Sequence, residues 1–418
     1  MRSTSFRYSF GIASFLAFGH GAAVAGGFAI TAQSASALGN AFAGTAEADD
    51  ASVVWFNPAG MTRLSGTNVV SSASLVRTSF KFENTASSGA FAAPGAGDGG
   101  DGGSTALVPQ LFASAHIAPD WSLGLAFNTP FGLKTEYPAG WRGQLTALKS
   151  EARSYNLDPS LAYRISDRLS VGAGVDWQRF TADLTNAAGP LGVAQLKASD
   201  SAWGFNLGAL YSLSDSTRIS AAYRSSFAYS LHGTARFSQG NGLFDSSIRA
   251  HLSVPENASL SVFSALSNRL ELMMGGVWTR WSRLAALSVI RTSGSALGAN
   301  GSTVSVLPFA WKNTVTLSVG ANYNVTPDWK VRIGFASDPA VSTTAERTPR
   351  LPDERRFTLS IGTRLRVRAR STIEVAYAHD FVRNAAINDT IAGVPGALVG
   401  HFDVAADVLS AQYNYELK

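Results

Sequence analysis

Apolar and polar residues alternate along several stretches of this chain. In the stretch 313–325 (NTVTLSVGANYNV), every second residue from Val315 onward is apolar, and most of the residues between them are polar. The stretches 372–378 and 411–417 repeat the pattern. Successive side chains of a β-strand point to opposite faces, so a period of two predicts strands with one apolar and one polar face. Soluble β-sandwiches alternate in the same way, and the pattern alone therefore leaves the fold open.

The connections between the predicted strands alternate between short and long. Six are short and turn-like, at 118–120, 166–167, 214–216, 265–268, 326–328 and 366–371. Between them fall seven longer polar or glycine-rich stretches, near 83–105, 130–152, 185–200, 238–255, 291–312, 339–355 and 384–404. Tight turns at one rim and long loops at the other are typical of outer-membrane barrels. Thirteen connections predict about fourteen strands, an even number, with both chain ends at the rim of the tight turns.

The segment 26–66 precedes the first strand and does not follow the strand pattern. Small residues dominate it, its apolar residues show no period of two, and it carries an acidic cluster within 47–50. An Asn-Pro-Ala turn at 57–59 follows, where proline breaks any regular strand. A compact non-strand segment ahead of a barrel is most simply a plug inside the lumen. The sequence therefore predicts an all-β fold, with a transmembrane antiparallel barrel of about fourteen strands at 67–418 and an N-terminal hatch at 26–66.

The first 25 residues have the features of a signal peptide. Two arginines form a basic start, 10–18 is apolar, and Ala-Val-Ala at 23–25 provides a small-residue cleavage site. We therefore expect 1–25 to be removed and the mature chain to start at Gly26. An exported chain that forms a barrel is expected in the bacterial outer membrane, which it would cross with many strands.

Composition excludes several other classes of protein. The chain contains no cysteine, so disulfides and thiolate metal sites are ruled out. Lys and Arg number 34 against 29 acidic residues, with no clustered basic stripe or recognition motif that would indicate a nucleic-acid partner. Asp98 and Asp101, in a glycine-rich loop, are too few ligands for calcium. We therefore expect no cofactor, no metal site and no nucleic-acid partner.

Short motifs are spread over the whole mature chain. They are SALGNAFAG at 36–44, DDA at 49–51, NPA at 57–59, GWRG at 140–143, DPSLAY at 158–163, WTRWS at 278–282, LP at 307–308, WK at 311–312 and LPD at 351–353. Each motif is weakly specific alone. In this order and spacing they resemble the FadL/OmpP1/TodX family of outer-membrane transporters for long-chain fatty acids and other hydrophobic compounds.

The resemblance implies a fourteen-stranded barrel that is closed by a hatch and takes a hydrophobic ligand into an apolar pocket. It assigns Asn57, Pro58 and Ala59 to the gate, although an Asn-Pro pair on its own is more simply a tight turn. It also implies lateral exit through the wall at a kinked strand. By family order this is the third strand, 121–128, which runs into the Asn128–Gly132 stretch with Pro130 at its centre.

The residues that would contact a ligand are the least constrained by the sequence. The aromatic hatch residues Phe28, Phe42, Trp55 and Phe56 could line a cavity or simply pack the hatch. A fatty carboxylate would need a cation at one end of an apolar cavity. The two candidates for this cation are Arg153 and Lys312, and either could equally be a solvated charge at the rim.

Three other functions compete with fatty-acid import. A barrel enzyme would need a nucleophile or paired acids with an orienting base, and the histidines show no catalytic or metal-binding spacing, so we predict no enzymatic activity. A general diffusion porin would need an open constriction and no hatch. A channel for aromatic hydrocarbons would share the same barrel and gate. We therefore expect fatty acids or aromatic hydrocarbons as ligands, outer-membrane lipid around the barrel, and a monomer.

Overall fold

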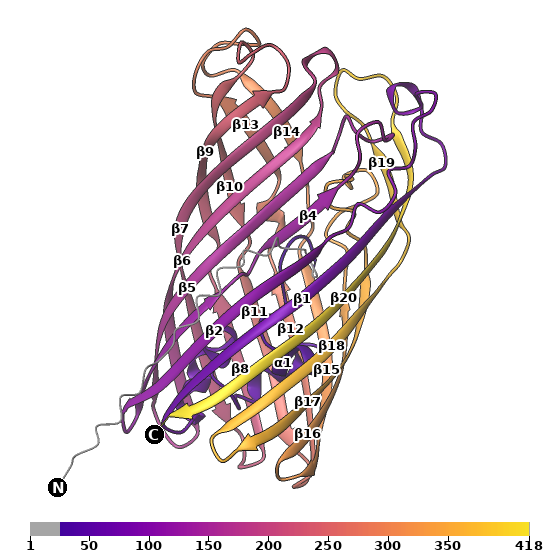
Figure 1. The fold of residues 1–418 in the computed structure, drawn as a ribbon. Helices are drawn as coiled ribbons and strands as arrows, with labels where there is room; N and C mark the ends of the chain where they lie inside the picture. The colour runs from indigo at the N-terminus through magenta and orange to yellow at the C-terminus, as the bar shows by residue number, and fades with distance from the viewer. Residues whose placement is uncertain (1–25, 418) are drawn as a thin grey trace, which may run out of the picture.

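The computed structural model describes residues 26–417, so the predicted leader at 1–25 lies outside the described residues. The strands tilt around a single barrel axis, and β20 ends at the lower rim (Figure 1). Within 26–417, no helix is long and apolar enough to cross a membrane. The barrel closes where β1 pairs with β20, antiparallel, from Thr67 opposite Leu417 to Asn84 opposite Gly400.

The predicted number of strands is confirmed, because the strand segments form a closed barrel of 14 antiparallel strands. Eight of these strands are continuous: β1 (Thr67–Asn84), β2 (Thr105–Ala118), β5 (Lys149–Arg164), β6 (Leu169–Ala187), β7 (Val193–Ser212), β16 (Trp329–Asp338), β17 (Arg356–Arg368) and β20 (Leu398–Leu417). The other six are each interrupted once: β3 (Trp121–Asn128) with β4 (Gly132–Glu136), β8 (Thr217–Arg224) with β9 (Phe227–Phe237), β10 (Ser246–Val254) with β11 (Asn257–Ala265), β12 (Leu270–Thr279) with β13 (Ala286–Arg291), β14 (Thr303–Pro308) with β15 (Thr314–Thr326), and β18 (Ser371–Val382) with β19 (Ala385–Asp389).

The six tight turns lie where the sequence predicts them. The outer connections at 85–104 and 339–355 also match the prediction, but several others are shorter than expected. β6 and β7 pair as far as Ala187 opposite Val193, so the expected connection at 185–200 shrinks to 188–192. The same holds at 238–255, where β10 already begins at Ser246. Polar sequence suggests a loop, yet polar residues extend a strand wherever a neighbouring strand offers hydrogen-bond partners for the backbone.

The wall has its apolar face outside, the reverse of a soluble protein. Along β3, exposed Leu123, Leu125 and Phe127 alternate with buried Ser122 and Asn128. Large exposed side chains on most other strands continue this apolar surface around the barrel. An apolar exterior with a polar interior is the pattern expected of strands surrounded by lipid.

The hatch consists of four short helical turns before β1. They are α1 (Ala35–Gly39), η1 (Ala43–Ala46), α2 (Val53–Phe56) and η2 (Pro58–Arg63). The Ser34 side chain caps α1, and the Asn57 side chain caps η2 by accepting from the Ala59 amide. α1 lies within the lower half of the barrel (Figure 1). The wall has glycine where the hatch backbone lies against it, since a Cβ at Gly334 would meet the Asn40 carbonyl carbon at 2.1 Å.

Candidate functional site

A cavity of about 190 Å³ lies between the hatch and the wall. The hatch contributes Phe42, Trp55 and Phe56 to its lining, and the wall contributes further aromatic residues, among them Phe227 and Trp281. Three of the four aromatic hatch residues predicted from the sequence thus line this cavity. An apolar lining of this kind favours a hydrophobic guest, because burial removes apolar surface from water.

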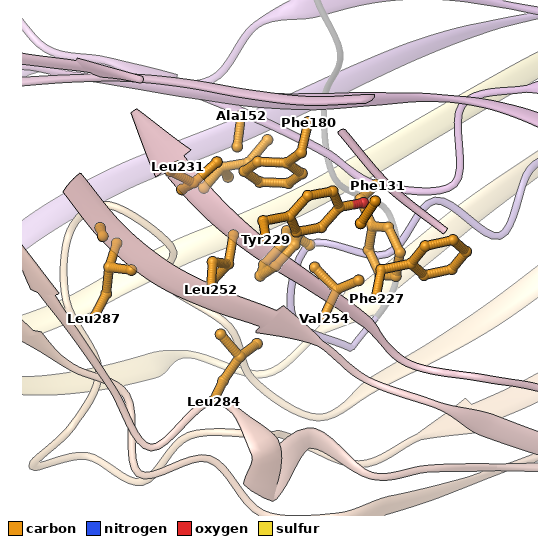
Figure 2. Packing of buried hydrophobic residues seen from close by; sticks show 14 of the residues in the cluster. Phe131, Ala152, Phe180, Phe227, Tyr229, Leu231, Leu252, Val254, Leu284 and Leu287 are labelled. Atoms are coloured by element: carbon orange, nitrogen blue, oxygen red, sulfur yellow. The ribbon is translucent and has the colours of Figure 1, made fainter. Parts of the chain in front are cut away.

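The fourth predicted residue, Phe28, packs beside the cavity rather than lining it. Its ring centre lies 5.5 Å from that of Phe131, 5.6 Å from Trp281 and 5.8 Å from Trp311. Figure 2 shows Phe131 together with Phe180 and other side chains of the buried cluster that Phe28 joins. Phe28 is only 6% exposed, so the start of the hatch is held by aromatic packing on several sides.

Two carboxylates bind the backbone just before Phe28. The Gly26 amide donates to Asp338 at 2.6 Å, and the Gly27 amide donates to Asp353 at 3.3 Å. Asp353 lies in the outer connection after β16, where it also accepts from Val341 and pairs with Arg356 at 3.2 Å. Burial raises the pKa of Asp353 to about 6, although the positive charge of Arg356 opposes the shift.

The wall is interrupted at the strand that the sequence nominates. β3 ends at Asn128 and β4 begins at Gly132, and Pro130 between them lines the cavity. Three residues of this strand face two on β5, since Asn128 pairs with Asn156 and Gly132 with Arg153. β2 pairs with β3 only from Leu111 onward. Within the described chain, no wall strand therefore pairs with the second edge of β2 at 105–110.

The hatch fills this gap from inside. The Ile30 amide donates to the Pro130 carbonyl at 2.8 Å, and the Gly132 amide donates to the Phe28 carbonyl at 2.9 Å. Ala29 and Phe131 are thereby paired antiparallel. This short strand pairing, which we call the seam, joins residues 28–30 of the hatch to residues 130–132 of the wall.

Amide side chains surround the seam. Gln33 donates to the Thr129 carbonyl at 3.0 Å and accepts from Asn128 at 2.9 Å, while Gln110 of β2 donates to the Ala32 carbonyl at 2.8 Å. Within 26–417, the remaining side-chain oxygens of Gln110, Asn128 and Thr129 are buried without a hydrogen-bond partner. A buried oxygen without a hydrogen-bond partner costs free energy, so these oxygens offset part of the stability that the hydrogen bonds around the seam contribute.

The Asn57-Pro58-Ala59 turn anchors the hatch to β7 and β8 of the wall. The Asn57 side chain donates to Ser220 at 2.7 Å and to the Ala209 carbonyl at 2.9 Å. The wall leaves room for it, because a Cβ at Gly208 would lie 2.0 Å from the Asn57 side-chain oxygen. The turn thus has a structural role in the closed state, and its role as a gate stays a prediction.

The acidic cluster of the hatch pairs with basic residues of the wall. Glu47 accepts from Lys330 at 2.7 Å and from Arg332 at 2.8 Å, and Asp49 accepts from Arg332 at 3.1 Å and from Arg364 at 2.7 Å. Burial alone would raise the pKa of Asp49, but these three cations outweigh it and hold the pKa well below its usual range. We call this group the ion cluster.

One cation at the cavity was not anticipated from the sequence. Arg224 of β8 lines the cavity, stacks 3.6 Å from the centre of the Trp55 ring and donates to the Trp55 carbonyl at 2.9 Å. Its guanidinium also pairs with Asp176 and, at 3.2 Å, with Asp158. Asp158 begins the DPSLAY motif at 158–163, so one of the motifs that carry the family resemblance also provides a partner for a buried arginine.

The two cations proposed from the sequence lie elsewhere. Neither Arg153 nor Lys312 belongs to the cavity lining. Lys312 is exposed, and its neighbour Trp311 is the residue that packs inward against Phe28. Arg153 occupies one of the outward-facing positions of β5. Their proposed contact with a ligand carboxylate therefore has no support from this arrangement.

Comparison with known proteins gives one family. The sequence model of outer membrane protein transport proteins (OMPP1/FadL/TodX) matches residues 16–417. The chain is 27% identical to outer membrane protein P1 of Haemophilus influenzae, covering 86% of each chain. It is 24% identical to the long-chain fatty acid transport protein of Escherichia coli, covering 87% of this chain and 89% of that one.

Solved structures share the fold. A Pseudomonas aeruginosa FadL homologue superposes with a TM-score of 0.85 at 24% identity, covering 94% of this chain and 100% of that one. The toluene transporter TodX of Pseudomonas putida superposes with a TM-score of 0.65 at 17% identity, covering 87% and 93%.

Proposed function

The chain belongs to the OMPP1/FadL/TodX family of outer-membrane transport proteins, and from this premise we propose that it imports long-chain fatty acids or similar hydrophobic molecules by a gated hatch and lateral exit through the barrel wall. The family carries hydrophobic compounds across the outer membrane. The cavity would receive the ligand, and the gap between β2 and β4 would release it. Since the relatives are transporters and channels, we propose no enzymatic activity.

The seam is the observation that carries this proposal. Opening the gap between β2 and β4 requires the hatch segment 28–30 to leave residues 130–132. The hydrogen bonds between neighbouring wall strands can all stay in place. Two backbone hydrogen bonds hold the seam, and each contributes about 0.5–1.5 kcal/mol net. A ligand that competes for the aromatic packing around Phe28 could therefore shift the seam toward the open state.

Lateral exit suits an apolar ligand. Release into an aqueous lumen would expose each methylene to water at a cost of about 0.8 kcal/mol. Passage between β2 and β4 keeps the apolar part of the ligand next to lipid, because the outer wall carries exposed leucines near the gap, among them Leu107 of β2 and Leu125 of β3.

A reversible crosslink across the seam tests the proposal. The chain contains no cysteine, so Ala29→Cys combined with Phe131→Cys introduces a single pair. Paired residues of antiparallel strands lie about 4.5–5.5 Å apart between Cα atoms, within the range that a disulfide spans. We expect the oxidised protein to lose uptake of labelled oleate or toluene in a host without its own importer, and reductant to restore it. The two single-cysteine variants control for loss of each side chain.

Each outcome of this experiment has a separate meaning. Undiminished uptake by the oxidised protein would refute exit through the seam while leaving transport intact. Absence of uptake by the reduced and the unmodified protein, with the barrel assembled in the outer membrane, would refute the transport proposal for these ligands.

A second candidate function, uptake of aromatic hydrocarbons, is favoured by the charges of the cavity. Arg224 is the lining cation, and Asp176, Asp158 and the Trp55 carbonyl already occupy its donors. A carboxylate would thus enter without a free counter-charge, which is unfavourable in a buried site. An apolar cavity of about 150 Å³ can hold benzene, so about 190 Å³ suits a small aromatic ring. Uptake of toluene without oleate would select this function.

A further inference from the structure

Cations collect on the outside of the wall over five neighbouring strands. Along these strands, buried residues such as Phe180 and Leu231 point inward, and the residues between them point outward. The outward-facing basic side chains are the cations Arg153 of β5, Arg179 of β6, Lys197 of β7, Arg236 of β9 and Arg249 of β10, together with the imidazole of His232 on β9. Except for the half-buried Arg153, all are exposed. We call these six residues the basic patch.

Strand register places the basic patch together. Arg153 pairs with Thr181, Thr181 with Ser199, Ser199 with His232, and His232 with Arg249. This single row therefore crosses five strands, or roughly 20 Å at the usual spacing between neighbours. Arg179 and Lys197 lie two residues from the row along their own strands, within diagonal reach of it, and Arg236 lies four residues from it.

The basic patch lacks a compensating charge. Within residues 26–417, no carboxylate forms an ion pair with any of its members, and Arg179 reaches only the hydroxyls of Ser199 and Ser201. The carboxylates close by have other partners, although one of them, Asp183, faces Lys197 in register. Lys149 pairs with Asp183 at 3.2 Å and with Glu151 at 2.8 Å, and Asp200 accepts from the Ser230 amide at 2.7 Å.

The opposite side of the barrel shows a different pattern. There Arg77 pairs in register with Asp407 and Lys81 with Asp403, and His401 lies 3.2 Å from Glu83. Charges of opposite sign thus face each other on β1 and β20, whereas in the basic patch Arg249 faces His232, and Lys197 faces Asp183, which already pairs with Lys149. The guanidinium and ammonium groups of the basic patch form no ion pair within residues 26–417, so an anion from outside the chain can complement them.

The height of the basic patch identifies that counterpart. On the same strands, toward the tight turns, the outward positions are apolar and include Leu157, Val175 and Phe205. The cations therefore lie at the outer edge of the apolar surface, where lipid acyl chains end and headgroups begin. Arginine binds phosphate through paired hydrogen bonds. We propose that the basic patch binds the phosphate groups of a phosphorylated glycolipid of the outer leaflet, whose acyl chains lie against the apolar surface below.

Lipid binding to purified protein tests this proposal, which is independent of the transport function. The probe is lipid A with two phosphates, measured on the full-length protein in detergent by native mass spectrometry. The test variant is Arg179→Gln, Lys197→Gln and Arg249→Gln together. Each basic residue near an anionic lipid surface contributes about a fivefold effect, so we expect binding to weaken on the order of 100-fold. Arg168→Gln, Arg368→Gln and Arg370→Gln, at the rim of the tight turns, form the matched control and should bind as the unmodified protein does.

Further measurements separate the sources of binding. Lipid A with one phosphate should bind more weakly than lipid A with two, and inorganic phosphate should not compete. The shift in gel mobility on heating, which reports a folded barrel, shows that the triple variant is assembled. Equal binding of lipid A by the triple variant and the unmodified protein would overturn the proposal. Competition by inorganic phosphate at equal concentration would also overturn it, because the basic patch would then be a plain anion site.

Discussion

Replacing Arg332 with methionine should release part of the hatch. The Arg332 side chain is fully buried and reaches three carboxylates, Glu47 at 2.8 Å, Asp49 at 3.1 Å and Glu374 at 3.2 Å. Methionine has a similar shape but no charge, so Glu47 and Asp49 would keep Lys330 and Arg364 as their ion-pair partners. The hatch carries two of the three acids, and its docking against the wall is therefore the interaction that weakens.

The expected size of the effect follows from burial. Removing one partner of a buried ion pair destabilises by about 3–5 kcal/mol, because the other charge stays buried and unpaired. A free energy of about 1.4 kcal/mol changes an equilibrium tenfold. The undocked hatch should therefore become more populated by roughly a hundredfold or more. Asn57 still anchors the far end of the hatch to the wall, so we expect frequent partial opening rather than a permanent pore.

Single-channel recording in planar bilayers would detect this opening. We expect brief conductance events in Arg332→Met that are rare in the unmodified protein. Arg366→Met is the matched control, because Arg366 pairs with Asp328 at an exposed turn where both side chains are about half exposed or more. Such pairs contribute little, and this variant should behave as the unmodified protein. Adding Glu374→Gln to Arg332→Met should reduce the effect, because one of the unpaired charges disappears.

The reasoning would be refuted if Arg332→Met, correctly assembled, showed no more conductance events than Arg366→Met. Hatch docking would then rest on apolar packing and on Asn57, and the ion cluster would only neutralise charge.

Three further predictions concern the hatch. Phe28→Ala should loosen the seam, since truncating a buried phenylalanine costs about 3–5 kcal/mol. Faster hydrogen exchange of the Ile30 and Gly132 amides would show this loosening. Unchanged exchange would mean that the hydrogen bonds alone stabilise the seam. The pKa of Asp353 is raised to about 6 from an ordinary value of 3.8, so between these pH values the folded protein holds a proton that the unfolded protein has released. The free energy of unfolding should therefore fall by about 1.4 kcal/mol per pH unit as pH rises from 3.8 to 6, and level off above 6. Thermal melting should show a smaller pH dependence in Asp353→Asn. Deleting residues 26–60 should produce a large steady conductance, and a conductance equal to that of the full chain would instead indicate a porin that does not depend on its hatch.

Much of the barrel could be predicted from the sequence because strand chemistry is local. Alternation of apolar and polar residues fixes which residues face lipid, and the order of short and long connections fixes the number of strands. The limits of the outer connections were less accurate, as at 188–192, because a polar stretch pairs as a strand only when its neighbour lies alongside. Residue order was likewise enough to place the hatch. The third strand was nominated by the family resemblance, and its role as the lateral opening stays a prediction.

The site itself depends on contacts between residues that are far apart in the chain. Glu47 meets Lys330 across 283 residues, and Arg224 meets Asp158 across 66, so no spacing in the sequence indicates either pair. The basic patch illustrates the same limit, since its members form no stripe in the sequence. Local patterning determined the strands, their lipid-facing side and the presence of a hatch. Register and barrel closure alone decided which charges meet, where the cavity lies and how the seam closes, because these depend on which strands become neighbours.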